Sequence, residues 1–307
     1  MDREKVKNLY FRQNAFGVSA VEFFWGLGIP IVLESTFLQL FLKKLGASSF
    51  AIGLVPALFM VGISCFPVFS SYLTRNLRYK RREVLLLHLI SGGAILFFGL
   101  ILRFTQQAEN VLPIFFACYA VFSACLGLTI PLWLNYLVRI FSESKAVPGL
   151  GYMMLFQNIA KVISSLFILK IVERYSFSIE SSSWVFIGTG LLFSLGSFWF
   201  LVTKEVAEKE VAAEDHRSFP EHTRKTFREI TGNRNFLVFL AAADMEFVVI
   251  VTTISFYANY ATQYYGVPAA IAAGIFVACI YAGSITVNIL LGTMNLLGLK
   301  QKFVLSK

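Results

Sequence analysis

The chain contains few of the residues from which enzyme active sites are commonly built. Its three histidines, His88, His216 and His222, are too scattered to form a ligand set, and neither an HExxH motif nor a Gly-x-x-x-x-Gly-Lys-Ser/Thr phosphate loop occurs. The four cysteines lie in apolar stretches without a CxxC pair, which argues against a disulfide framework or a structural zinc site. We therefore expect no enzyme activity, no metal site and no cofactor.

Charged residues are also scarce, because they make up 15% of the chain against 57% for hydrophobic residues. A water-soluble domain cannot hide that much apolar surface. Apolar stretches of about 20 residues or more recur along the chain, and each can cross a hydrocarbon layer of about 30 Å as a helix. Uninterrupted runs of this length are not typical of barrel strands. The sequence thus predicts an all-α, polytopic transmembrane bundle of eight helices, at residues 14–42, 48–73, 84–102, 111–141, 151–172, 184–202, 236–264 and 268–297.

The basic residues gather in short segments that recur after every second span. A formal net charge of +9 is compatible with nucleic-acid binding, but short basic segments between spans are more typical of membrane topology. The positive-inside rule then places both termini in the cytoplasm. We expect an integral protein of the plasma (inner) membrane that contacts membrane lipids and no nucleic acid.

Composition divides the chain into three parts. Residues 204–234 switch abruptly to Glu, Lys, Arg, Asp and Thr, which cannot lie in hydrocarbon. We interpret this segment as a charged cytoplasmic linker between a six-helix bundle, residues 1–203, and a partial second bundle of two helices, residues 235–307. Loops match loops and spans match spans between the start of each bundle, which predicts an internal repeat. The matched positions include Phe16 and Phe236, Val18 and Val238, Gly46 and Gly266, and Lys80 and Lys300.

The loop between the second and third spans fits the frame of a transporter motif, Gly-x-Leu-x-Asp-Arg-x-Gly-Arg-Lys/Arg. Leu73 and Lys80 agree with the motif, Ser71 and Arg78 replace its two glycines, and Arg75 stands in place of its acid. With six helices, a long charged linker and a second set of helices, the chain resembles the major facilitator superfamily.

This resemblance implies a secondary transporter whose gating loop, Arg75, Arg78 and Lys80, lies at the cytoplasmic side. In the family the acid helps to latch the two halves together, so we expect the latch to differ where arginine replaces it. Members typically have twelve helices. The resemblance therefore also implies a chain truncated after the eighth helix, with the missing C-terminal helices or a second chain as its partner.

Charged side chains inside the spans are the strongest functional signal, because each costs roughly 2.5 to 3.5 kcal/mol unless it faces water or a partner. The first span carries Glu22 and Glu34 on either side of residues 26–30, where two glycines and Pro30 favour a bend. The seventh span carries Asp244. Because interrupted helices often line transport sites, we expect these acids to bind protons or coupling ions. The alternative is acids that reach the membrane surface or bond to a neighbouring helix.

Lys161 lies near the middle of the fifth span, with Gln157 one turn earlier on the same face and Asn158 on an adjoining face. A fixed cation flanked by amides can hold an anionic group. We therefore expect these three residues to bind the substrate, and we slightly favour an anionic or zwitterionic solute. A structural or gating ion pair with a carboxylate of another span is the alternative.

These signals together predict a secondary active transporter that moves a small solute by alternating access, with proton coupling through Glu34, Glu22 or Asp244. One alternative is a transport-inactive, truncated remnant or a regulatory partner of a membrane complex. A weaker alternative is a polytopic membrane enzyme that acts on lipids. The substrate itself is not predicted, since one fold serves many solutes.

Overall fold

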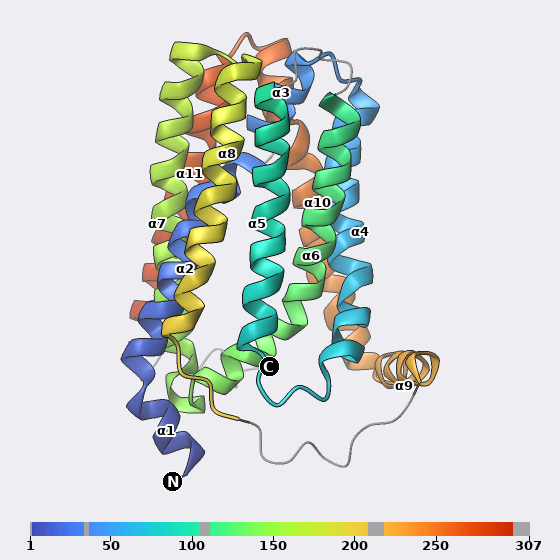
Figure 1. Ribbon diagram of the computed structural model, residues 1–307, viewed down its shortest axis with the longest axis vertical. Helices are drawn as coiled ribbons and strands as arrows, with labels where there is room; N and C mark the ends of the chain where they lie inside the picture. Colours follow the sequence, from blue (N-terminus) through green and yellow to red (C-terminus); the bar gives the residue numbers. More distant parts are fainter. Residues whose placement is uncertain (1, 34–36, 105–110, 208–217, 297–307) are drawn as a thin grey trace.

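The computed structural model describes residues 2–33, 37–104, 111–207 and 218–296, and within these ranges every regular element is a helix (Figure 1). Seven stretches of the described chain are long and apolar enough to cross a membrane. They are Phe11–Lys44 (α2, Phe11–Val32, with α3, Phe37–Lys44), Ser49–Thr74 (α4), Arg81–Phe104 (α5), Val111–Ile140 (α6), Glu143–Tyr175 (α7), Ile179–Val202 (α8, Ile179–Ser197, with the short 3-10 helix η2, Phe198–Val202) and Ala269–Val287 in α11, Ala269–Leu296. The remaining predicted span is helix α10, Arg234–Tyr264, many of whose side chains lie outside the described part. The all-α polytopic bundle is confirmed.

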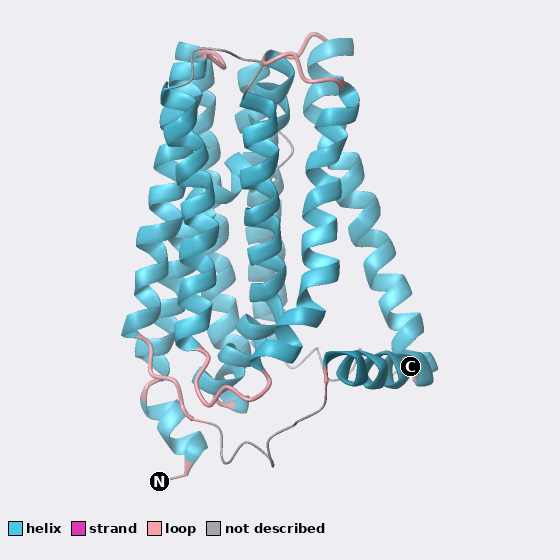
Figure 2. Cartoon of the chain, turned by 45° about the vertical axis from the view of Figure 1, so that its right-hand side comes forward, coloured by secondary structure: helices cyan, strands magenta, loops and turns pink. Residues whose placement is uncertain are grey.

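The long helices lie alongside one another and pack in pairs. α2 packs on α7 and α8, α4 packs on α6, α5 packs on α8, and α11 packs on the outside of this group against α7 (Figure 1). The short helix α1, Arg3–Leu9, lies at one end of the bundle, and α9, Phe219–Gly232, lies crosswise at the same end (Figure 2). We call this the N-terminal end and the other, where α3 leads into α4, the opposite end.

Several helices extend past the apolar stretches that predict them. α7 begins at Glu143 rather than at residue 151. Its first turns carry Lys145, which is charged, and Pro148, which is unfavourable inside a helix. α8 likewise begins before residue 184, at Ile179. Ser178 caps this helix, because its hydroxyl accepts a hydrogen bond from the backbone N–H of Ser181 at 3.1 Å. Hydropathy therefore locates the middle of each helix but not its polar ends.

The first crossing is interrupted, but two residues beyond the stretch 26–30 in which a bend is expected. α2 continues through residues 26–30 and ends at Val32, after Pro30, which has no N–H to donate to the preceding turn. The two glycines in this stretch allow close packing. A Cβ on Gly26 would lie 2.5 Å from the backbone oxygen of Gln157 on α7, and a Cβ on Gly28 would overlap the ring of Phe193 on α8.

An aromatic cluster holds α3 in the core at the opposite end. The ring centroids of Phe41 and Phe186 are 5.3 Å apart, and those of Phe98 and Phe186 are 4.9 Å apart. Phe37 packs edge-on against the same Phe186 ring, and all four side chains are buried. Edge-to-face contacts of this kind add to the gain from burial. They fix the second part of the first crossing although α3 is short.

The predicted repeat is visible in where the helices begin and end. α3 ends at Lys44 and α10 ends at Tyr264, while α4 begins at Ser49 and α11 begins at Ala269. Both pairs show the offset that aligns the two copies in the sequence. The second pair of helices therefore reproduces the turn at which the first crossing leads into the next.

The turns themselves also match. Gly46 and Gly266 occupy equivalent places and have positive φ values of 83° and 63°, a conformation that glycine adopts without a Cβ penalty. Next to them, Nζ of Lys43 donates a hydrogen bond to Oε1 of Gln263 at 3.2 Å, across a separation of 220 residues. The two copies therefore contact each other through equivalent residues beside their turns.

Candidate functional site

Three polar residues, Glu22 of α2 with Gln157 and Lys161 of α7, lie near the middle of the bundle, and we call them the polar track. Glu22 of α2 is 9% exposed, and its Oε2 accepts a hydrogen bond from Nε2 of Gln157 on α7. Gly26 lies one turn beyond Glu22 and meets the backbone of the same Gln157. Because a side chain at Gly26 would keep the two helices apart, this glycine is what brings the carboxylate and the amide together.

Lys161 continues the track toward α11. It lies one turn beyond Gln157 on α7, and its Nζ is 4.4 Å from the ring centroid of Tyr281, within the range of a cation–π interaction. Tyr281 is buried and lies two turns beyond Gly274, where α11 packs closely enough that a Cβ would be 2.6 Å from Cβ of Leu169. Lys161 therefore lies where the first six crossings meet the repeated pair of helices.

The structure brings together three of the residues expected to carry function, Glu22, Gln157 and Lys161. Asn158 is buried on an adjoining face of α7, as its position in the helix requires. Glu34 and the side chain of Asp244 lie outside the described residues, so their part in the track stays a prediction.

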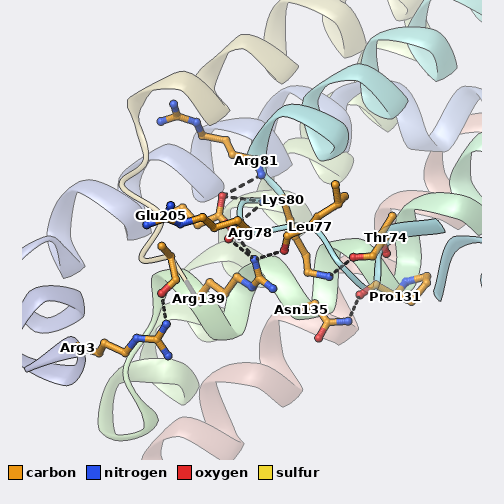
Figure 3. A network of polar contacts seen from close by, with 11 residues as sticks. Arg3, Thr74, Leu77, Arg78, Lys80, Arg81, Pro131, Asn135, Arg139 and Glu205 are labelled. Atoms are coloured by element: carbon orange, nitrogen blue, oxygen red, sulfur yellow. Dashed lines mark hydrogen bonds and ion pairs between the residues drawn. The ribbon is translucent and has the colours of Figure 1, made fainter. Parts of the chain in front are cut away.

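A second polar cluster lies at the N-terminal end, in the segment that follows η2 (Figure 3). The Glu205 side chain is 3% exposed, and its carboxylate accepts hydrogen bonds from the backbone N–H of Lys80 at 2.8 and 3.0 Å and of Arg81 at 2.9 Å. Its Oε1 also lies 3.4 Å from Nη1 of Arg139 on α6. A negative charge at a helix N-terminus is favourable, so Glu205 caps α5 and ties it to α6.

Arg139 anchors the loop between α4 and α5. Its Nη1 donates to the backbone oxygen of Leu77 at 3.1 Å and to that of Arg78 at 2.8 Å (Figure 3). The same guanidinium faces Glu205, so one arginine joins the loop, α6 and the segment after η2. Such a shared network is costly to break, because removing one partner leaves buried charge without compensation.

The three residues of the predicted gating loop do not converge on one site. Nζ of Lys80 donates to the backbone oxygen of Thr74 at 3.0 Å. The Arg75 guanidinium lies 4.2 Å from the ring centroid of Tyr72, on the side where α9 packs. Arg78 contributes its backbone oxygen to the Arg139 anchor. The loop is thus fixed to the first six crossings by its backbone as much as by its charges.

Helix α9 rests on the end of α4. The ring of Phe219 stacks on Phe69 with centroids 5.0 Å apart and meets Tyr72 edge-on at 5.3 Å. Nε2 of His222 lies 3.3 Å from the hydroxyl of Ser71. Part of the charged segment between the two sets of helices is therefore a helix that docks at the N-terminal end.

Among the residues of these clusters, Glu205 and Tyr281 were not expected from the sequence to carry function. Tyr281 follows Gly274 by two helical turns, so spacing alone puts it on the same face of α11 as that glycine. Glu205 is one acid among several in a charged segment. Its role depends on the chain turning back at Thr203 toward the start of α5, which no local pattern records.

A sequence model described as Major Facilitator Superfamily matches residues 15–305. The chain belongs to the major facilitator superfamily. Comparison with curated proteins and with solved structures gave no match. Family membership and the apolar helices together make this facilitator an integral membrane protein and a secondary transporter whose partner is a small-molecule solute.

Proposed function

We propose that this facilitator moves its solute by alternating access, and that the track of Glu22, Gln157 and Lys161 binds the solute and the coupling ion. The observation that carries the proposal is an acid on α2 hydrogen-bonded to an amide on α7, with a cation one turn beyond that amide, inside a membrane-spanning bundle. Ionisable groups at this depth are rare unless they line a pathway or pair with each other. Transporter sites also lie near the midplane where repeats meet, as Lys161 and α11 do.

Lys161 supplies the charge for substrate recognition. Its ammonium group faces the Tyr281 ring, which offers a weaker attraction than a carboxylate or phosphate of a solute. The Gln157 amide has a second N–H and a carbonyl oxygen with which to orient that solute. Asn158 adds an amide on the next face of α7. This set favours an anionic or zwitterionic solute.

Glu22 supplies the site for proton coupling. The Gln157 amide donates a hydrogen bond to its carboxylate, so the acid and the amide are directly coupled. Protonation removes the charge and turns one oxygen into an O–H donor, so the bond from the amide loses its charge assistance and shifts to the remaining carbonyl oxygen. Proton binding at Glu22 would thereby change how Gln157 meets the solute. Glu34 and Asp244 remain alternative coupling acids.

The contacts of α11 support a conformation that is open at the N-terminal end. From Ala272 to Tyr281 its inner face is buried, whereas further along, toward the N-terminal end, Val287 and Leu290 are more than half exposed. Lys43 and Gln263 join the two copies at the opposite end. The distribution of basic residues supports a cytoplasmic position for the open end and for both termini, at the plasma membrane.

The parts of the chain then have separate mechanical roles. Residues 1–203 form one rocking half, residues 235–307 belong to the other, and residues 204–234 link them. Glu205 and Arg139 keep the gating loop attached to the first half, so that this half moves as a body.

Uptake into proteoliposomes tests the proposal with a panel of radiolabelled anionic, zwitterionic and neutral solutes. Lys161→Ala should lower uptake of the transported solute about tenfold or more, because its charged group loses a counter-charge. Glu22→Gln should flatten the pH dependence of uptake, since an amide does not titrate. Lys170→Ala, a matched change at the exposed end of α7, should transport normally. Unchanged uptake and unchanged pH dependence in both track variants would discard these assignments.

The same experiment separates the alternatives. A correctly folded wild-type protein that moves no member of the panel would favour a regulatory partner or a transport-inactive remnant. Turnover of a lipid by the purified protein would favour a membrane enzyme instead.

A further inference from the structure

A groove of about 680 Å³ lies on the surface between α2 and α7 at the N-terminal end. It is separate from the polar track, because the groove residues of α2 centre on a face about 100° around the helix from Glu22. Its large side chains are exposed, with Phe16 at 58% and Tyr152 at 52%. The residues that define it are Arg12, Phe16, Ser19 and Phe23 of α2 with Lys145 and Phe156 of α7.

The groove is polar at its mouth and aromatic along its length. Arg12 and Lys145 lie in the first turns of α2 and α7, both at the N-terminal end. Phe23 lies eleven residues beyond Arg12, or about 16 Å deeper at about 1.5 Å per residue. In a membrane-spanning bundle this spacing puts the two cations near the headgroups and the phenyl rings beside the acyl chains.

The two cations are available for an external anion. Nζ of Lys145 lies 5.5 Å from the ring centroid of Phe11, and no described carboxylate pairs with it or with Arg12. Glu143 precedes Lys145 by two residues, which turns it about 200° away on the helix, and it does not line the groove. The mouth therefore carries net positive charge.

Ser19 gives a second indication of a missing partner. It lines the groove, is 5% exposed, and its hydroxyl has no hydrogen-bond partner within the described part of the chain. Buried hydroxyls normally find a partner. Ser19 lies two turns deeper than Arg12, about 10 Å along the helix, the side of the phosphate on which a phospholipid carries its glycerol ester oxygens.

We propose that this groove binds one anionic phospholipid. Its phosphate group lies between Arg12 and Lys145, an ester oxygen accepts a hydrogen bond from Ser19, and an acyl chain lies along Phe16, Phe23 and Phe156. Basic pockets between membrane helices select anionic headgroups by charge, while the aromatic length adds apolar contact. The proposal requires only that the bundle spans a membrane and does not depend on the transport mechanism.

Native mass spectrometry of the purified protein, titrated with phosphatidylglycerol or phosphatidylcholine, tests this site. The wild type should retain one phosphatidylglycerol in preference to phosphatidylcholine. Arg12→Gln with Lys145→Gln should weaken phosphatidylglycerol binding roughly tenfold or more and leave phosphatidylcholine binding unchanged. Lys44→Gln with Lys170→Gln removes the same charge from exposed residues at the opposite end and should bind as the wild type does.

A second variant tests the contribution of the aromatic side chains along the groove independently of charge. Ala20 lines the groove, so Ala20→Trp should fill it and lower phosphatidylglycerol binding while both cations remain. A thermal melt of each variant checks its fold. Equal binding of both lipids by the wild type, full phosphatidylglycerol retention by the double glutamine variant, or an equal loss in the charge control would each overturn the proposal.

Discussion

The first crossing and its counterpart in the repeat, α10, occupy equivalent places but pack differently. α2 carries Gly26 and Gly28 where it meets α7 and α8, whereas the equivalent positions of α10 are Glu246 and Val248. Residues near the start of α10 are largely exposed, with Phe239 at 64%. A repeated sequence thus preserves helix length and turn geometry, while the closeness of neighbouring helices depends on individual small residues.

The two helices also differ in continuity. Ile250 stands in α10 where α2 has Pro30, and α10 runs without interruption from Arg234 to Tyr264. In the first copy, close packing sets Glu22 against Gln157, about three turns before the end of α2 at Val32. The first copy therefore combines a buried acid, a hydrogen-bond donor and a helix end, which is the combination expected at a transport site.

The largest effect on stability should come from replacing Gly28 of the first copy by valine, the residue at the equivalent position 248 of the second. In Gly28→Val, the new Cβ would overlap the ring of Phe193 and lie 2.9 Å from Cγ2 of Thr189. Overpacking of this kind costs about 1 to 3 kcal/mol or more, so we expect Tm in detergent to fall by about 5 °C or more.

Gly188→Val is the matched control, because it makes the same change on α8 at a position with nothing within 4 Å of a new Cβ. It should leave Tm nearly unchanged. If both variants melt alike, the close packing of α2 on α8 is not what distinguishes the first copy.

Much of this fold follows from the sequence, because a long apolar run in a membrane has few alternatives to a helix. The turns at Gly46 and Gly266 were equally readable, since both need the conformation that glycine tolerates. The start of α7 at Glu143 was not, because a helix can extend from the apolar layer into the headgroup region without any change in periodicity.

The candidate site was predictable only where it depends on one helix. Gln157 and Lys161 share a face of α7 by spacing alone. Their partners Glu22 and Tyr281 come from α2 and α11, and the pairing of helices is decided by glycine contacts that hydropathy does not record. Glu205 was missed for a related reason, since its partners are backbone N–H groups, which have no sequence signature.

A smaller effect is expected where the second copy docks on the first. In Gly274→Leu, the new side chain would start 2.7 Å from the backbone oxygen of Ser165 and 2.6 Å from Cβ of Leu169, so α11 must move away from α7. The first six crossings pack mainly on one another and should stay folded. We expect the two parts to associate about fivefold to a hundredfold more weakly, corresponding to about 1 to 3 kcal/mol.

Trypsin cleavage between α8 and α10, followed by size-exclusion chromatography in detergent, measures that association. The two fragments of the wild type should elute together, and those of Gly274→Leu should separate. Gly283→Leu changes the same helix at a place with nothing within 4 Å and should behave as the wild type. Co-elution of the Gly274→Leu fragments would mean that α11 is held chiefly by other contacts.

The smallest effect concerns the pair of equivalent residues that joins the two copies, Lys43 and Gln263. The bond between them is exposed, so Lys43→Gln alone should cost no more than about 1 kcal/mol. If the two positions are equivalent, exchanging them in Lys43→Gln with Gln263→Lys rebuilds the same bond from the other side. The Tm of the exchanged protein should therefore return to the wild-type value, although each single variant melts slightly lower.

If the decrease in Tm of the double variant equals the sum of the decreases in the two single variants, the surroundings of the two residues differ. The symmetry of the turns would then not extend to the side chains between them.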